Sequence, residues 1–218
     1  MKFTKSMFFR TRIHPVLAKI PIYDYYLLRK KSYLKTAGWF KSFREGVSID
    51  NEGNPVPWFT YAAIEFLKER IPADVTVFEY GSGMGTLWWA SKVKQVDVVE
   101  DDEKWMKMIE PKLAGNVNIM HRTPDNSYSS AIEESKRKYD VIIVDGKIRN
   151  ECCKKAIHCL SEKGVLILDD SQRESQMDSI DLLKSNGFKQ LKFKGLKPIE
   201  FISSETSIFY KTGSILDL

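Results

Sequence analysis

The stretch VFEYGSGMGTLWWA carries the residues most suited to holding a ligand, because Gly81, Gly83 and Gly85 lie between a β-rich run and a helical pattern. Glycine has no Cβ, so a glycine backbone can turn sharply and approach a ligand closely. The amides at the start of the next helix then face that ligand. Ser82 and Thr86 belong to the same turn. We therefore predict a ligand-binding loop over residues 81–86.

Two acidic positions accompany this loop. Glu79 comes two residues before the first glycine, and Glu100 ends the next apolar run, VDVVE, with Asp101 after it. A carboxylate at the tip of the second strand can accept hydrogen bonds from both hydroxyls of a ribose. The alternative is that Glu100 and Asp101 are surface acids that cap a helix over 102–113, with Asp101 as its N-cap.

Three more carboxylates end later apolar runs: Asp145 follows one run, and Asp169 and Asp170 follow the next. The carboxyl ends of parallel strands meet at the edge where ligands bind, so we expect these side chains to cluster. Carboxylate oxygens are the ligands that magnesium prefers, which predicts a metal site. Alternatively, Asp145 orients an acceptor without metal while the other two cap the chain.

Three neighbouring residues leave alternatives open. Arg149 and Arg173 follow the two acidic turns and could grip an anionic substrate group or simply neutralise the carboxylates. His121, after a short strand, is a rival general base, although a lone histidine is more often a surface residue.

Strand and helix patterns alternate around these residues. The strands are predicted over 75–80, 96–100, 117–120, 139–145, 164–170, 188–194 and 206–211. The helices are predicted over 58–70, 86–93, 102–113, 150–161 and 174–186, with a further charged helix before residue 139. This alternation predicts an α/β three-layer sandwich with a mostly parallel sheet. No helix separates the last two strands, so we expect the last strand of the seven to be antiparallel.

The E-x-G-x-G-x-G pattern of residues 79–85 resembles the first signature of class I S-adenosylmethionine-dependent methyltransferases. The dinucleotide pattern G-x-G-x-x-G would instead need glycine at Thr86. The resemblance implies a Rossmann-like fold and S-adenosylmethionine as cofactor, with the loop around its methionine part and Glu79 near the amino group. It also implies that Glu100 holds the ribose and that Asp101 lies near the adenine. The absence of Lys and Arg from 78 to 91 fits a cofactor without phosphate.

Asp145, Asp169 and Asp170 also resemble the strand-end acids of metal-dependent O-methyltransferases of the catechol and macrolide-sugar types. The catechol type has a lysine base three residues after the first Asp; here that position is Ile148, and Lys147 is one residue early. The resemblance implies methyl transfer to a small-molecule or sugar hydroxyl, with Asp145 as catalytic residue.

Other classes remain open. Polyamine aminopropyltransferases share this cofactor fold, and a non-catalytic cofactor-binding module is a third possibility. The Asn/Asp-Pro-Pro-aromatic signature of amino-methylating nucleic-acid enzymes is absent, because VDGKIR stands there, so a nucleic-acid substrate is not expected.

Four aromatic residues near the loop could face a sulfonium cation or pack in the core: Trp58, Tyr61, Trp88 and Trp89. For Trp88 and Trp89 we predict packing. Trp58 and Tyr61 begin the segment that often covers the cofactor in related methyltransferases.

The N-terminal segment differs in charge from the rest. Residues 1–45 carry a net charge of +9 and the remainder carries −4. We predict a helical extension over 1–50 that packs through its aromatic residues, and a methyltransferase domain over 56–218. The positive charge predicts an anionic partner: a phosphate-bearing substrate, a membrane surface or nucleic acid. The alternative is a solvated helical lead-in without such a partner.

The cysteines indicate the compartment. Cys152, Cys153 and Cys159 are few and clustered, which fits a reducing cytoplasm rather than a disulfide framework. Their spacing, with His158, matches no standard zinc pattern. The N-terminal apolar run ends at Arg10, too early for a secretory signal.

Overall fold

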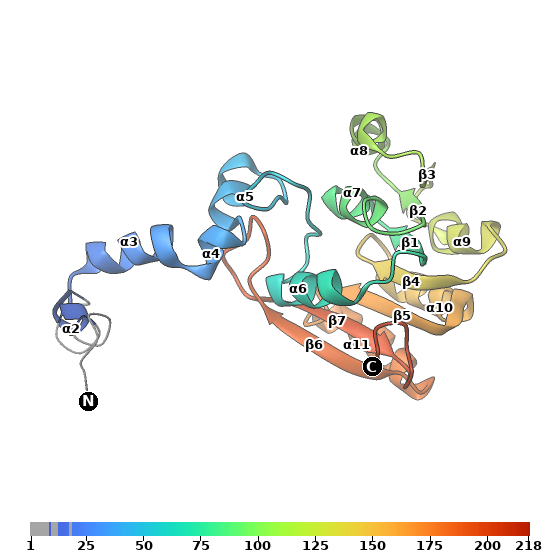
Figure 1. The fold of residues 1–218 in the computed structure, drawn as a ribbon. Helices are drawn as coiled ribbons and strands as arrows, with labels where there is room; N and C mark the ends of the chain where they lie inside the picture. Colours follow the sequence, from blue (N-terminus) through green and yellow to red (C-terminus); the bar gives the residue numbers. More distant parts are fainter. Residues whose placement is uncertain (1–8, 10–12, 18) are drawn as a thin grey trace.

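The computed structural model describes residues 9, 13–17 and 19–218 (Figure 1). Its seven-stranded sheet has the order β3-β2-β1-β4-β5-β7-β6. The strands are β1 (Thr76–Tyr80), β2 (Gln95–Glu100), β3 (Val117–His121), β4 (Tyr139–Val144), β5 (Leu160–Asp169), β6 (Lys189–Gly195) and β7 (Ser204–Tyr210). Only β7 runs antiparallel, between β5 and β6. The predicted α/β sheet with an antiparallel last strand is confirmed.

Helices cover both faces of this sheet. Those of the main body are α6 (Tyr61–Arg70), α7 (Met84–Ala90), α8 (Glu103–Ile109), α9 (Asn126–Glu134), α10 (Arg149–Cys159) and α11 (Met177–Ser185), with 3-10 turns η2 (Glu110–Lys112) and η3 (Glu174–Gln176). One apolar cluster joins α9, α10 and α11 to the sheet, and another joins α6 and α7 to its opposite face. The result is the expected three-layer sandwich.

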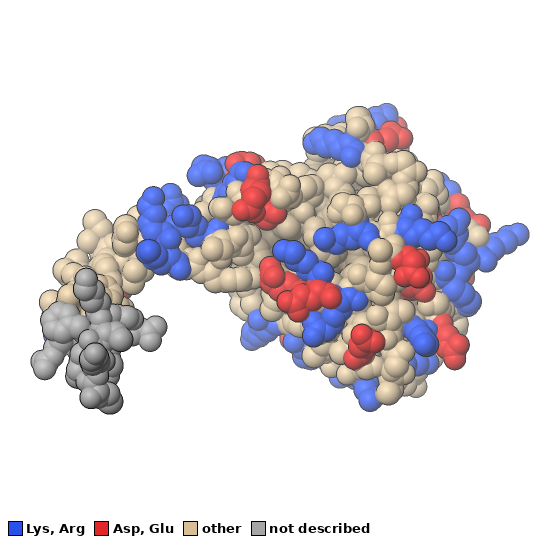
Figure 2. All heavy atoms as spheres, viewed as in Figure 1, with Lys and Arg blue, Asp and Glu red and all other residues tan. Residues whose placement is uncertain are grey.

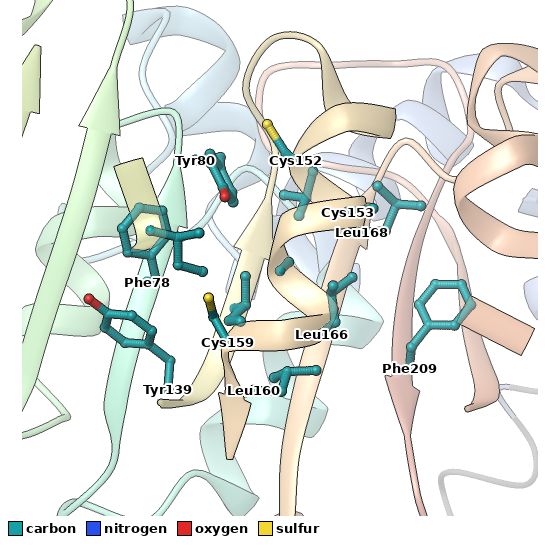
Figure 3. Packing of buried hydrophobic residues seen from close by; sticks show 14 of the residues in the cluster. Phe78, Tyr80, Tyr139, Cys152, Cys153, Cys159, Leu160, Leu166, Leu168 and Phe209 are labelled. Carbon is teal, nitrogen blue, oxygen red and sulfur yellow. The ribbon is translucent and has the colours of Figure 1, made fainter. Parts of the chain in front are cut away.

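The three cysteines lie in the first of these clusters. Cys152, Cys153 and Cys159 are buried and unbonded, and they pack beside residues such as Phe78 and Leu166 (Figure 3). Burial raises the pKa of Cys153 to about 12, so its thiol stays protonated at neutral pH. These cysteines are core residues of the sheet–helix interface.

Several element boundaries differ from the prediction for local reasons. The helix α6 begins at Tyr61 instead of residue 58, because the Thr60 backbone N–H donates to the Thr206 hydroxyl at 3.0 Å. The strand β5 begins at Leu160 instead of residue 164, with an irregular register before Val165. Residues 161–164 (SEKG) lack apolar side chains, so no hydrophobic pattern marks this part of the strand.

The predicted N-cap of the third helix was wrong by one residue. Asp102, not Asp101, caps α8, and its carboxylate accepts from the backbone N–H groups of Lys104 and Trp105 at 2.9 and 3.0 Å. Glu100 binds the N–H groups of both Asp101 and Asp102 at 2.9 Å, so the turn extends one residue further. Asp101 is thereby left at the rim of the site.

The N-terminal helices are α2 (His14–Leu17), α3 (Pro21–Lys31), α4 (Tyr33–Thr36) and α5 (Trp39–Glu45). The helices α2 and α3 extend away from the body as an arm, whereas α4 and α5 lie against it (Figure 1). The helix α3 has no buried residue, and Tyr25 is 59% exposed. The expectation that the aromatic residues of this segment pack was therefore wrong for α3. Among the described residues, no helix has the length and apolar character needed to cross a bilayer.

The helix α5 does pack as predicted. The Trp39 indole Nε1 donates to the Glu200 carbonyl oxygen at 2.6 Å, and the Phe43 and Phe201 ring centroids lie 6.2 Å apart. Ser42 is buried and exchanges hydrogen bonds with the backbone of Ile49. These contacts fix the chain after α5 against the loop between β6 and β7.

Candidate functional site

A cavity of about 950 Å³ opens at the carboxyl ends of β1, β2, β4 and β5. This edge is where parallel α/β sheets bind ligands, and the volume suits a ligand larger than a single amino acid. The predicted residues that line it are Glu79, Gly81, Ser82, Gly83, Gly85, Glu100, Asp101, Asp145, Asp169 and Asp170. The structure thus brings together every predicted cofactor and metal residue except Thr86.

The glycine loop forms one end of the cavity. Gly81 has a φ of +90°, and a Cβ there would come within 3.0 Å of the Gly146 Cα, so the β1 and β4 ends approach each other closely. A Cβ at Gly83 would meet no atom within 4 Å. Gly83 therefore borders open space in the cavity.

Thr86 does not line the cavity, but its side chain holds the glycine loop in place through hydrogen bonds. Its buried hydroxyl accepts from the Gly83 backbone N–H at 3.0 Å and donates to Glu79 at 2.6 Å. This pair of hydrogen bonds starts α7 at Met84, two residues earlier than predicted. The loop, the helix start and the Glu79 carboxylate are thus held as one unit.

Glu79 is 5% exposed, and burial, opposed by the Thr86 hydrogen bond, raises its pKa to about 8. Its second oxygen, Oε1, accepts no hydrogen bond from the described residues. A carboxyl group in this state can accept a positively charged ligand group, which would favour its ionised form.

Glu100 is buried at the tip of β2, beside the loop. Its Oε2 accepts from the Ser82 backbone N–H and hydroxyl at 2.7 and 2.6 Å, while Oε1 accepts from two backbone N–H groups. A carboxylate offers about four acceptor positions, and all four are used. A ribose would therefore have to displace the Ser82 hydroxyl.

The carboxylate cluster of Asp145, Asp169 and Asp170 forms the other end. Oxygen atoms of the three residues lie within 4.8 Å of one another. Asp145 is the partly open member, with its side chain 29% exposed and one oxygen bonded to Arg149 at 2.9 Å. Burial and the neighbouring Asp169 raise the pKa of Asp145 well above its usual range.

Each member of the cluster has a cationic partner. Lys197, from the loop between β6 and β7, contacts both Asp169 and Asp170. Arg149 reaches Asp145 and Asp170, and Arg173 contacts Asp170 at 2.5 Å. Burial lowers the pKa of Lys197, but the two aspartates outweigh burial and raise it, so the ammonium group stays charged. Of the two roles considered for Arg149 and Arg173, the structure shows the pairing with carboxylates.

The structure separates the aromatic candidates. Trp58 is 46% exposed and lines the cavity, whereas Tyr61, Trp88 and Trp89 are buried in the core. The core position of Trp88 and Trp89 was predicted. His121 does not line the cavity; its Nε2 lies 3.2 Å from the Asp101 carbonyl oxygen, so the histidine is not placed to act as a base there.

The lining residues that were not predicted include Trp105, Gln176 and Lys197. Trp105 is in the first turn of α8, five residues after Glu100, and its Nε1 donates to the Ser82 carbonyl oxygen at 2.9 Å. That spacing could have identified it. Lys197 and Gln176 carry no comparable signal, because both come from segments without a motif.

The chain matches no family model. It is 34% identical over 148 residues to a polyamine aminopropyltransferase of Methanocaldococcus jannaschii, which is 59% of this chain and 47% of the relative. The chain thus spans about half the length of this curated relative.

Solved structures share the fold. A precorrin-6Y C5,15-methyltransferase from Geobacter metallireducens has a TM-score of 0.54 at 14% identity, covering 76% of this chain and 97% of that one. A candidate methyltransferase from Streptococcus mutans, solved in complex with SAH, has a TM-score of 0.50 at 13% identity, covering 67% and 94%. The chain has the class I S-adenosylmethionine-dependent methyltransferase-like Rossmann fold.

Proposed function

We propose that this protein is an S-adenosylmethionine-dependent methyltransferase that acts on a hydroxyl group of a small molecule or sugar, with residues 56–218 as the transferase domain. One observation carries the proposal. A single cavity joins an open glycine loop, flanked by two buried acids, to a partly exposed aspartate at the end of β4. Cofactor and acceptor can therefore meet in one cavity.

The cofactor residues in this proposal are Glu79, Gly81, Ser82, Gly83, Gly85, Thr86, Glu100 and Asp101. The open space at Gly83 and the uncommitted Oε1 of Glu79 fit a ligand with an amino group. Glu100 would hold the ribose once the Ser82 hydroxyl turns away. Asp101, at the rim, would lie near the adenine.

The acceptor residues lie at the carboxylate cluster. S-adenosylmethionine supplies a methyl group already activated on a sulfonium, so the protein chiefly aligns the acceptor. Asp145 would accept the proton that the acceptor hydroxyl loses. Gln176 is 7% exposed, and its Oε1 is buried without a hydrogen-bond partner. The partly exposed Asp145 carboxylate at this end favours a ligand that donates a hydrogen bond, such as a hydroxyl group.

Aminopropyl transfer is the second candidate, because the Methanocaldococcus jannaschii relative has that activity in its name. The charge of the site argues against it. A polycationic amine would need free carboxylates, but Asp169 and Asp170 are already paired with Lys197, Arg149 and Arg173. The acceptor end therefore offers little net negative charge.

Calorimetry and transfer assays separate these functions. We expect S-adenosylmethionine and SAH to bind at one site, and labelled methyl groups to appear on a hydroxylated small molecule. Tighter binding of decarboxylated S-adenosylmethionine, with transfer to putrescine, would instead establish aminopropyl transfer. Binding without transfer to a broad set of sugars and phosphorylated metabolites would indicate a non-catalytic module, and NADH binding would refute the cofactor assignment.

For the arm, we propose peripheral contact with an anionic membrane surface from the cytoplasmic side. Figure 2 shows cationic side chains gathered where the arm joins the body. The helix α3 exposes Ile22 and Tyr25 and ends in Arg29, Lys30 and Lys31. Sedimentation with phosphatidylglycerol vesicles, but not with phosphatidylcholine vesicles, is the expected result, and removal of residues 1–31 should abolish it. Equal binding to both vesicle types would contradict a charge-driven contact.

A further inference from the structure

Lys197 is the least expected charge in the cavity wall. It is 2% exposed, and its ammonium group contacts Asp169 Oδ2 and lies 2.5 Å from Asp170 Oδ1. A buried lysine is costly unless carboxylates pair with it, and here two of them do. The ammonium group therefore lies between two of the three aspartates that the sequence suggested as metal ligands.

The remaining oxygen atoms of these two aspartates are also committed. Asp169 Oδ1 accepts from the Thr206 hydroxyl at 2.7 Å, and Asp170 Oδ1 accepts from the Ser204 hydroxyl at 2.8 Å. Asp170 Oδ2 pairs with Arg173 at 2.5 Å and with Arg149 at 3.5 Å. Thus all four carboxylate oxygens of Asp169 and Asp170 already have donors.

The cluster also contains as many cationic side chains as acidic ones. Three aspartates face three cations, namely Lys197, Arg149 and Arg173. Magnesium requires about six oxygen ligands in near-octahedral geometry, and it is held by carboxylates that are free to coordinate it. A divalent ion would have to displace Lys197 and would add two positive charges beside the cations that already pair with these aspartates. The residues present do not fit the predicted magnesium site.

We propose that Lys197 is a built-in cation that takes the place of a divalent metal at the acceptor end of the cavity. As a positioning residue, it locks Asp169 and Asp170 and leaves Asp145 as the carboxylate that faces the acceptor. The inference deepens the proposed function, on which it rests for the identity of the acceptor end, and it makes the transfer metal-independent. The arrangement of charge itself can be tested without any substrate.

The test compares the wild-type protein with Lys197→Ala and with Lys194→Ala, which removes an exposed lysine of β6. Loss of the buried partner should lower the Tm of Lys197→Ala by roughly 6–20 °C, whereas Lys194→Ala should match the wild type. Millimolar MnCl₂ should raise the Tm of Lys197→Ala and bind at one site by calorimetry, because the exposed carboxylates can then coordinate the ion. NaCl at equal ionic strength should not reproduce this recovery.

The wild-type protein provides the decisive control, because it needs no variant to fold. We expect no Mn²⁺ binding and no change in Tm for it. Stoichiometric Mn²⁺ binding to the wild type that Asp169→Asn abolishes would overturn the proposal, as would a folded Lys197→Ala that ignores Mn²⁺. Failure of the methyltransferase assignment would leave both measurements unchanged, so the two failures are distinguishable.

Discussion

The two ends of the cavity are built in opposite ways. The glycine-loop end consists of backbone and open space from one short stretch of chain, with two buried acids beside it. The carboxylate end consists of side chains from segments far apart in sequence, which pair acid with base until the charges balance. An open backbone surface can receive a large ligand, whereas a balanced ionic cluster holds one reactive group in position. The comparison predicts that substitutions at the first end change affinity and substitutions at the second change turnover.

The largest expected effect is at the first end. Gly83→Val should abolish measurable SAH binding, because its side chain would occupy the open space beside the loop. The fold should survive, because a Cβ there meets no atom within 4 Å. Titration calorimetry with SAH is the measurement. Gly115→Val, at another glycine where a Cβ would meet nothing, is the matched control. Wild-type affinity in Gly83→Val would refute this position for the cofactor.

At the second end, Asp145→Asn should lower kcat by roughly 10²–10⁴-fold, because the amide cannot accept the acceptor's proton. SAH affinity should stay within a few-fold of wild type, since Asp145 lies at the acceptor end. Initial rates at saturating cofactor give the measurement, and Asp181→Asn, on the exposed face of α11, is the control. A variant that loses SAH affinity but keeps its kcat would reverse the proposed division of the cavity.

The buried Glu79 carboxyl group at the first end should make the stability of the protein depend on pH. Its pKa of about 8 in the folded protein exceeds its ordinary value of 4.5, so the folded state holds a proton that the unfolded state releases. The contribution of Glu79 to stability should therefore fall as pH rises from about 4.5 to 8. Glu79→Gln should remove this loss of unfolding free energy, which is on the order of a few kcal/mol over that pH range.

Urea unfolding of wild type and Glu79→Gln between pH 5 and 9 provides the measurement. The difference in free energy of unfolding should increasingly favour the variant as pH rises, and Glu162→Gln, at an exposed position, should show no such trend. A constant difference across this range would mean that Glu79 is ionised throughout.

The smallest effect concerns the hydrogen bond that a ribose must replace. Ser82→Ala removes the hydroxyl that donates to Glu100 Oε2 at 2.6 Å but keeps the backbone N–H donor. SAH should then bind up to about tenfold more tightly, since one protein hydrogen bond no longer competes. Weaker binding of SAH to Ser82→Ala would indicate that the hydroxyl contacts the ligand directly. Ser91→Ala, whose hydroxyl donates to the Trp88 carbonyl oxygen in α7, is the control.

The sequence by itself determined the sheet, its antiparallel last strand and the glycine-loop end. The reason is that these features are local: Glu79, the glycines and Thr86 lie within eight residues, and period and turn residues mark each strand. The same locality placed Asp145, Asp169 and Asp170 at strand ends, where the parallel sheet brings them together.

Only the tertiary structure decided what these carboxylates face. Lys197 reaches Asp169 across 28 residues of chain, through the position of β7 between β5 and β6, and no spacing in the sequence records that contact. The same is true of α3, whose aromatic residues suggested burial but none of whose residues is buried. The composition shows which charged groups need partners and which aromatic rings need burial. The path of the chain decides which groups come into contact with them.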